Sequence, residues 1–130
     1  MYNELILDHH AHPQYYGNLK DADFRKTLRN ASCGDELTIA LKIKDDKIID
    51  ARFEGVGCAI SRASADMMLE MIIGKTIREL KELEELFSGL LTSGASDKEE
   101  LKDLCAFSNI AHMPARVNCA KLPWKIVEYF

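Results

Sequence analysis

Residues 37–58 read LTIALKIKDDKIIDARFEGVGC, and this stretch decides the fold. An apolar side chain recurs at every second position from Leu37 to Ile43, and again from Ile49 to Phe53. A period of two is typical of a strand that buries one face. Asp45-Asp46, between the two runs, favours a tight turn. The pattern therefore predicts a β-hairpin of two antiparallel strands.

The spacing of apolar residues changes after the hairpin to that of helices. Spacings of three and four predict a helix from Cys58 to a stop at Gly74. Thr76 and Glu79 form a capping box, which predicts the start of another helix. The small residues from Ser88 to Ala95 are expected to form a loop.

Both ends of the chain also show helical spacing. The first helix is expected to run from Tyr2 to about His9, and residues 10–34 are expected to be loop with at most one short element. A second capping box at Ser96 to Glu99 predicts a short helix. Pro114 suits a first helical turn, and the last helix is expected to continue past Pro123 with a kink.

A hairpin followed by a run of helices predicts an α+β fold, and the 130 residues predict a single domain, 1–130. The composition is 47% hydrophobic and 29% charged, an ordinary globular balance. A net charge of −4 without a basic block argues against nucleic acid as a partner. There is no apolar run of the roughly 20 residues that a membrane span needs. The first residues do not resemble a secretory signal, so we expect a cytoplasmic protein.

In a reducing compartment the four cysteines are better candidates for metal ligands than for disulfides. Cys33 and Asp35 flank Gly34 just before the first strand, and in an extended chain they project to the same side. Cys58 follows the second strand. Because the two strands pair as a hairpin, the start of one and the end of the other share an edge of the sheet. Cys33, Asp35 and Cys58 are therefore expected to lie close together, with Cys58 at a helix N-terminus that favours a thiolate.

Three ligands leave a fourth position open. Cys119 is one candidate and Cys105 another, although Cys105 lies four residues after Leu101 and suits an apolar helix face. The remaining candidates are the histidines, His9, His10, His12 and His112. Thiolates with one carboxylate suit Zn²⁺ or Fe²⁺, and do not suit Mg²⁺ or Ca²⁺.

Three separated segments resemble the IscU/SufU/NifU family of iron–sulfur cluster assembly proteins. They read NASCGDE (30–36), FEGVGCAISRAS (53–64) and PARVNCAKLPW (114–124). The resemblance covers nearly the whole chain. It implies an IscU-like α+β fold, with a small, mostly antiparallel sheet and helices on one face. It also implies that Cys33, Asp35, Cys58 and Cys119 form the ligand set.

Two features are similar to the SufU branch of that family. Asn118 stands where IscU-type scaffolds carry a histidine, and residues 88–109 form an extra region between the second and third motif cysteines. The branch resemblance implies bound Zn²⁺ and a cysteine desulfurase of the SufS type as partner. A [2Fe–2S] cluster is the alternative, transient occupant. A downstream iron–sulfur carrier or apoprotein would receive the product.

The resemblance also implies roles for single residues. Cys33 is the expected sulfur acceptor, in the SufU manner, and Cys119 is the alternative acceptor, as in IscU-type proteins. Arg116 lies three residues before Cys119, about one helical turn away, where a positive charge would stabilise a thiolate. Asp35, a harder ligand than a thiolate, is expected to be released most readily.

The function predicted is sulfur acceptance or cluster scaffolding, without enzymatic turnover of a small molecule. The alternative is a small structural zinc domain, but a closed structural site favours four tight ligands and Asp35 counts against it. A cysteine hydrolase would need a Cys–His pair, and no histidine is near a motif cysteine in sequence.

Overall fold

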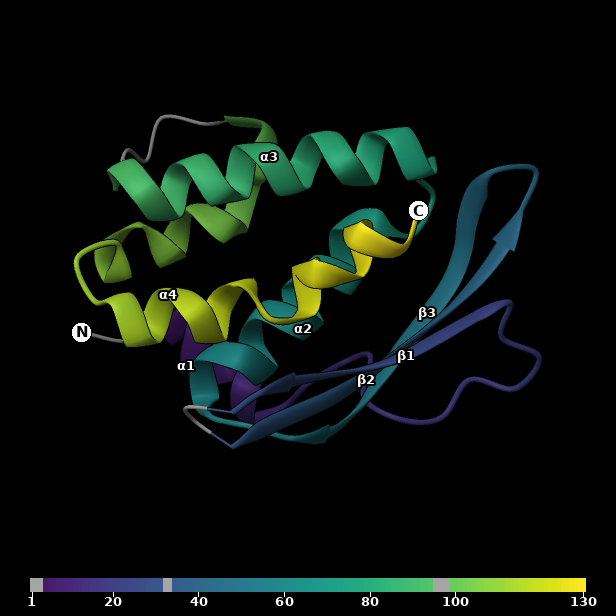
Figure 1. Cartoon of the computed structure of the whole chain (residues 1–130), viewed down its shortest axis with the longest axis horizontal. Coiled ribbons are helices and arrows are strands. Elements are labelled where there is room, and N and C mark those ends of the chain that lie inside the picture. The colour runs from purple at the N-terminus through teal and green to yellow at the C-terminus, as the bar shows by residue number, and fades with distance from the viewer. Residues whose placement is uncertain (1–3, 32–33, 95–98) are drawn as a thin grey trace.

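The computed structural model describes residues 4–31, 34–94 and 99–130 (Figure 1). Cys33 and the predicted capping-box residues Ser96, Asp97 and Lys98 lie outside the described residues. Within the described ranges, no helix combines the length and apolar character that a membrane crossing requires. The elements in chain order are α1 (Glu4–Ala11), β1 (Phe24–Asn30), β2 (Asp35–Lys44), β3 (Lys47–Val56), α2 (Ala59–Ile72), α3 (Ile77–Ser93), the 3₁₀ helix η1 (Glu99–Ile110), α4 (Pro114–Lys121) and the 3₁₀ helix η2 (Pro123–Tyr129).

The three strands form an antiparallel sheet in the order β1-β2-β3, and the helices cover one of its faces (Figure 1). The predicted hairpin is β2 and β3, and the one short element expected before it is β1. This arrangement confirms the predicted α+β fold. Because Glu36 pairs with Val56 near the open end of the hairpin, the start of β2 lies beside the chain that leads into α2.

One part of the predicted strand pattern is wrong, because Ile49 does not share the buried face of Ala51 and Phe53. The ladder shifts between Lys42 and Ile43, so that Lys42 pairs with Asp50 while Ile43 pairs with Ile48. Ile49 is the extra residue of this irregularity and is 42% exposed, whereas Ile48 is completely buried. An inserted residue reverses the facing of the side chains beyond it, which a strict period of two does not anticipate.

α3 begins as predicted but continues through the segment expected to be a loop. Its capping box is present, and the hydrogen bond from the Thr76 backbone N–H lowers the pKa of Glu79. The helix extends to Ser93 because Leu90 and Leu91 are buried and the Thr92 and Ser93 hydroxyls donate to carbonyls one turn earlier. It ends at Gly94, which takes the left-handed conformation of a C-cap, with φ of 75°.

The last helix is two helices rather than one kinked helix. Pro114 occupies the first turn of α4 as predicted, but α4 ends at Lys121. Pro123 then opens η2, where a residue without a backbone N–H is tolerated. The Leu122 N–H donates to the Cys119 carbonyl at 3.3 Å, a tightened final turn that re-aims the chain into η2.

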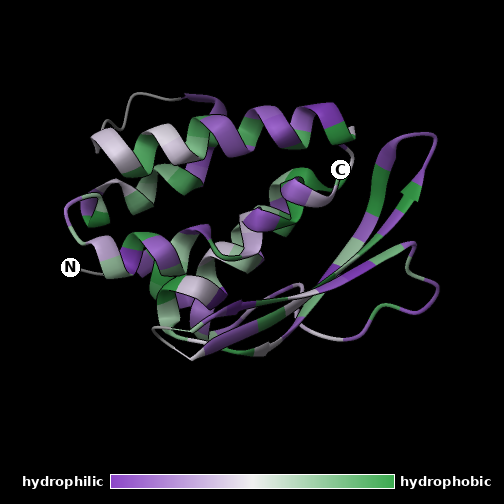
Figure 2. Cartoon of the chain, viewed as in Figure 1, coloured by the Kyte–Doolittle hydropathy of each residue, from purple (hydrophilic) through white to green (hydrophobic). Residues whose placement is uncertain are grey.

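The core lies between the helices and the covered face of the sheet. Hydrophobic and hydrophilic residues alternate along the helices and strands (Figure 2), and the buried hydrophobic residues of the sheet and of the helices belong to one core cluster. Phe87 packs on Trp124 and Phe107, with ring centroids 5.1 and 5.6 Å apart. The Trp124 indole donates to the Ser64 hydroxyl at 3.2 Å, and Ser64 donates to the Ala120 carbonyl at 2.6 Å. This chain of hydrogen bonds joins η2 to α2 and α4 inside the core.

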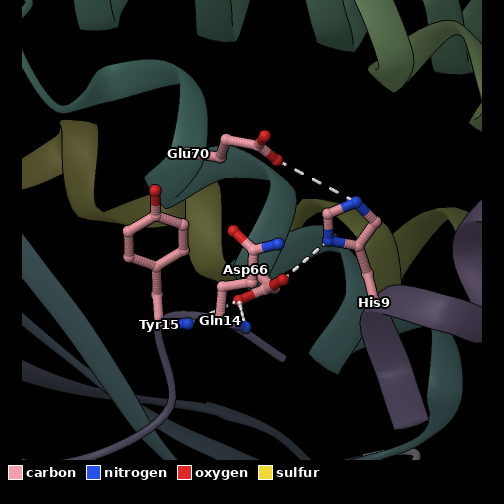
Figure 3. A network of polar contacts seen from close by, with 5 residues as sticks. All are labelled: His9, Gln14, Tyr15, Asp66 and Glu70. Atoms are coloured by element: carbon pink, nitrogen blue, oxygen red, sulfur yellow. Dashed lines mark hydrogen bonds and ion pairs between the residues drawn. The ribbon is translucent and has the colours of Figure 1, made fainter. Parts of the chain in front are cut away.

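A buried carboxylate on α2 holds the N-terminal part of the chain (Figure 3). Asp66 is fully buried and accepts the backbone N–H groups of Gln14 and Tyr15, both at 2.9 Å. Its other oxygen lies 2.6 Å from Nδ1 of His9. Glu70 approaches the opposite ring nitrogen of His9 at 3.9 Å. His9 therefore packs at the end of α1, as expected, but against a partner that the sequence did not reveal.

Replacing Asp66 is expected to destabilise the fold strongly. Asp66→Ala removes a fully buried acceptor that holds the Gln14 and Tyr15 backbone N–H groups and the buried His9 ring, and we expect a loss of about 3–5 kcal/mol of unfolding free energy. Urea titration followed by circular dichroism measures it. Glu70→Ala is the matched control, because Glu70 is 46% exposed and makes only the longer contact. We expect that control to change stability by less than about 1 kcal/mol. Equal effects for the two variants would refute the anchoring role of Asp66.

A glycine on β3 allows close approach of the neighbouring strand. Gly55 has a φ of +126°, and an added Cβ would lie 2.1 Å from the Glu36 carbonyl oxygen. We expect Gly55→Ala to cost about 2–4 kcal/mol in the same urea titration. Gly89 on α3 is exposed with nothing within 4 Å, so Gly89→Ala is expected to stabilise by about 0.5–1 kcal/mol. A harmless Gly55→Ala substitution would contradict this register.

Candidate metal centre

Three predicted ligands from three parts of the chain meet at one end of the sheet. Asp35 begins β2, Cys58 is the N-cap of α2, and Cys119 lies on α4. One carboxylate oxygen and the two sulfur atoms all lie within 4.8 Å of one another. Among the described residues, this is the one group of three or more such side chains with a geometry that would hold a metal ion.

The carboxylate of Asp35 is placed to bind a cation. Asp35 is only 3% exposed, and its Oδ1 accepts the backbone N–H of Cys58 at 3.0 Å. Its Oδ2 is buried and has no hydrogen-bond partner among the described residues. A buried carboxylate oxygen without a partner is costly, and a metal ion at this position would remove that cost. The donor atoms therefore fit a thiophilic metal that also accepts one oxygen ligand.

Cys58 occupies the start of α2, where backbone N–H groups point toward its sulfur. The sulfur accepts the backbone N–H of Ser61 at 3.5 Å, so the cysteine caps the helix with its own side chain. The buried Ser61 hydroxyl lies 3.8 Å from the same sulfur and donates to the Cys58 carbonyl at 3.2 Å. The Ser61 backbone N–H thus orients the Cys58 sulfur at the start of the helix, where the helix N-terminus favours a negative charge.

The glycine before Cys58 leaves room for this arrangement. A Cβ on Gly57 would lie 2.3 Å from the Ser61 hydroxyl and 3.3 Å from Oδ1 of Asp35. Any larger residue at position 57 would displace one or both of these groups. The Gly55-Val56-Gly57 stretch therefore allows the β3–α2 connection to pass directly behind the carboxylate.

Cys119 is enclosed by the protein. It is 1% exposed, and the side-chain amide of Asn30 lies 3.8 Å from its sulfur. Asn30 ends β1 and pairs with Asp35 on β2. One residue of this pair belongs to the cluster, and the other lies beside the Cys119 sulfur. Asn30 was not among the residues predicted for the site. Its place three residues before Cys33, inside a motif, was the available signal.

The other candidate residues lie apart from this cluster or are not described. Cys33 lies outside the described residues, but its neighbours Ala31 and Gly34 are exposed. Cys105 is half-buried against the apolar core, as its helical spacing predicted. None of the four histidines belongs to the cluster within the described part of the chain. Arg116 is half-buried on α4, one turn before Cys119, and its role stays a prediction.

Comparisons with known proteins show the family to which the chain is similar. Residues 1–120 match the family model described as the NifU-like N terminal domain. The chain is 42% identical over 128 residues to an iron-sulfur cluster assembly scaffold protein IscU of Thermotoga maritima, covering 98% of this chain and 90% of the relative. It is 36% identical over 129 residues to the zinc-dependent sulfurtransferase SufU of Bacillus subtilis, covering 98% and 87%.

A solved structure shows the same fold. The crystal structure of a putative iron-sulfur cluster assembly scaffold protein for the SUF system, from Fervidobacterium islandicum, superposes with a TM-score of 0.92. The two chains are 38% identical, and the match covers 98% of this chain and 94% of the other. The match extends over the sheet, the helices and all three motif segments, so the chain belongs to the NifU-like N-terminal domain family.

Proposed function

We propose that this chain is an iron–sulfur cluster assembly protein that accepts sulfur from a cysteine desulfurase. The observation that carries the proposal is the cluster of Asp35, Cys58 and Cys119, in which one buried Asp35 oxygen has no hydrogen-bond partner among the residues that the structure describes. The names of the relatives support it, because one is a scaffold for cluster assembly and another is a zinc-dependent sulfurtransferase. Sulfur acceptance and cluster scaffolding are two uses of one set of thiolates.

In this proposal Asp35, Cys58 and Cys119 hold Zn²⁺, and Cys33 supplies the fourth ligand. Three thiolates and a carboxylate match the ligand chemistry and number of a tetrahedral zinc site. When bound, the ion keeps cysteine sulfur deprotonated and shields it from oxidation until the partner arrives. Iron and sulfide are the cargo that the same residues hold when a [2Fe–2S] cluster is assembled.

The burial of Cys119 disfavours it as the acceptor, which leaves Cys33, the acceptor that the resemblance to SufU implies. Cys119 is 1% exposed, so the persulfide of a partner protein cannot reach its sulfur without rearrangement of α4. In the proposed step, the Cys33 thiolate attacks the outer sulfur of the desulfurase persulfide. A new S–S bond forms on Cys33, the S–S bond of the desulfurase breaks, and its cysteine leaves as a thiolate. In this proposal Arg116, three residues before Cys119 on α4, stabilises negative charge at the centre.

The expected partners follow from this step. A SufS-type desulfurase supplies the sulfur, and an iron–sulfur carrier or apoprotein in the cytoplasm receives the product. The chain acts as a stoichiometric acceptor, since each transfer leaves its own cysteine modified until the next partner removes the sulfur. A purely structural zinc domain is less well supported, because a closed site gains nothing from a carboxylate in place of a fourth thiolate.

The ligand set predicts which cysteines matter for zinc. Cys33→Ser, Cys58→Ser and Cys119→Ser are each expected to lower zinc affinity at least about tenfold, because each removes a thiolate ligand. Competition with a chromophoric chelator measures the affinity. Cys105→Ser is the matched control, since Cys105 packs on the core away from the cluster, and it should bind zinc like the unmodified protein. Zinc loss in Cys105→Ser equal to that in Cys58→Ser would refute this ligand set.

Anaerobic native mass spectrometry tests the transfer itself. The zinc-loaded protein is measured before and after incubation with a cysteine desulfurase and free cysteine. We expect a zinc-bound species that gains one sulfur atom, with the gain lost in Cys33→Ala and kept in Cys105→Ala. A species that carries iron and sulfide after iron is added would assign the cluster-scaffold role. Tightly bound zinc without any sulfur uptake would overturn the acceptor mechanism.

A further inference from the structure

A groove on another part of the molecule is not used by the chemistry of the metal centre. It lies between the C-terminal half of α2, the N-terminal half of α3, and η1, and its volume is about 550 Å³. α3 packs mainly on η1 and η2 rather than on α2, which leaves this space open. Met71, on its wall, lies about 20 Å along the α2 axis from Cys58. A molecule in the groove would therefore leave the metal centre accessible.

The floor of the groove is apolar and adaptable. Met67, Leu83 and Leu104 are buried beneath it, and Met71 and Leu86 are half-buried along it. Unbranched methionine side chains adjust to different apolar partners, which is why they recur at surfaces that bind peptides. The volume is within the range of sites that bind a ligand or an anchoring side chain.

The rim of the groove is strongly acidic. Five carboxylates and two lysine ammonium groups line it, so most of the net charge of −4 of the chain is concentrated here. The acidic residues are Glu70, Glu79, Glu82, Glu100 and Asp103, and the basic residues are Lys75 and Lys102.

One wall of the groove comes from the extra region between the second and third motif cysteines. η1 belongs to that region and is kinked at Lys102, which has φ of 49° and ψ of −123°. Glu100 and Asp103, on either side of the kink, both line the groove, together with Leu104. The extra region therefore adds acidic and apolar groups to a surface that α2 and α3 alone would not enclose.

We propose that this groove binds a cationic, amphipathic segment of a partner protein. An apolar side chain of the segment enters the methionine and leucine floor, and flanking lysine or arginine residues face the rim carboxylates. The charge of the rim selects this occupant, because an acidic or neutral segment would leave the carboxylates unneutralised. A second copy of this chain, which is itself acidic, is a poorer electrostatic match. The groove would thus dock a partner while its reactive group reaches the metal centre separately.

Fluorescence anisotropy with the full-length, zinc-loaded protein tests the proposal. The probe is a fluorescein-labelled amphipathic helical peptide of leucine and lysine, and the matched controls are a leucine–glutamate peptide and spermine. We expect saturable binding of the leucine–lysine peptide that weakens as salt increases, and much weaker binding of both controls. Equal binding of the leucine–glutamate peptide would overturn the role of charge, and equal binding of spermine would overturn the role of the apolar floor.

Variants locate the binding surface. The double variant Glu82→Lys/Asp103→Lys, called the rim variant, reverses two exposed rim charges and should weaken peptide binding at least about tenfold. The control Glu128→Lys, on η2 and outside the groove, should change peptide binding less than about twofold. Met71→Gln should weaken binding without a change in charge. All these variants should keep the zinc affinity of the unmodified protein. A failure of the groove proposal is therefore distinguishable from a failure of the proposed metal centre. Equal losses in Glu128→Lys and the rim variant would overturn the groove assignment.

Two further measurements decide between the groove and other surfaces. Backbone amide chemical shifts perturbed by the peptide should cluster around Met71, Leu86 and Leu104. Perturbations centred on Asp35 and Cys58 would overturn the proposal. Sedimentation should show the same oligomeric state for the unmodified protein and for Glu82→Lys/Asp103→Lys. A dimer of the unmodified protein that is lost in this variant would assign the groove to a second copy of the chain instead.

Discussion

The hydrogen bond from the Cys58 backbone N–H to the Asp35 carboxylate joins the two halves of the metal centre. It connects the first residue of β2 to the first turn of α2, across the open end of the hairpin. Two features accompany this contact: a Cβ on Gly57 would lie 3.3 Å from the same carboxylate oxygen, and the second carboxylate oxygen is buried without a hydrogen-bond partner among the described residues. A carboxylate fixed on one side and unsatisfied on the other is a preorganised ligand.

The surrounding framework keeps this centre in place through buried polar groups. Asp66 ties α1 and the chain after it to α2, while Ser64 ties α2 to α4 and η2 through Ala120 and Trp124. α2 is thus held on both sides, and it carries Cys58 at one end. Because buried hydrogen bonds are costly to break singly, these networks restrict the relative movement of α2 and α4, which supply Cys58 and Cys119.

Reactivity and recognition are separated along α2. The N-terminal end of the helix points backbone N–H groups at the cysteine sulfur, and its C-terminal half forms a wall of the acidic groove. In the proposed function the sulfur passes from the cysteine of one protein to that of another, so a partner needs a stable attachment that does not cover the thiolates. A charged groove about 20 Å away satisfies both demands, and its electrostatic attraction would speed the encounter more than it would tighten the final complex.

By itself the sequence determined the hairpin, the helix after Cys58, the capping box at Thr76 and the family, because each is a local pattern of periodicity, capping or motif. It also named Asp35, Cys58 and Cys119 as candidates. Only the tertiary structure decided that Ile48 is buried rather than Ile49, and that α3 continues through Ser88. It also decided two contacts between residues far apart in the chain, Asn30 with Cys119 and Asp66 with His9. These features depend on an irregular strand pair, on burial against neighbouring helices and on contacts between residues far apart in the chain. Local propensity does not contain that information, because each of these features is set by the neighbouring strands and helices that pack against it.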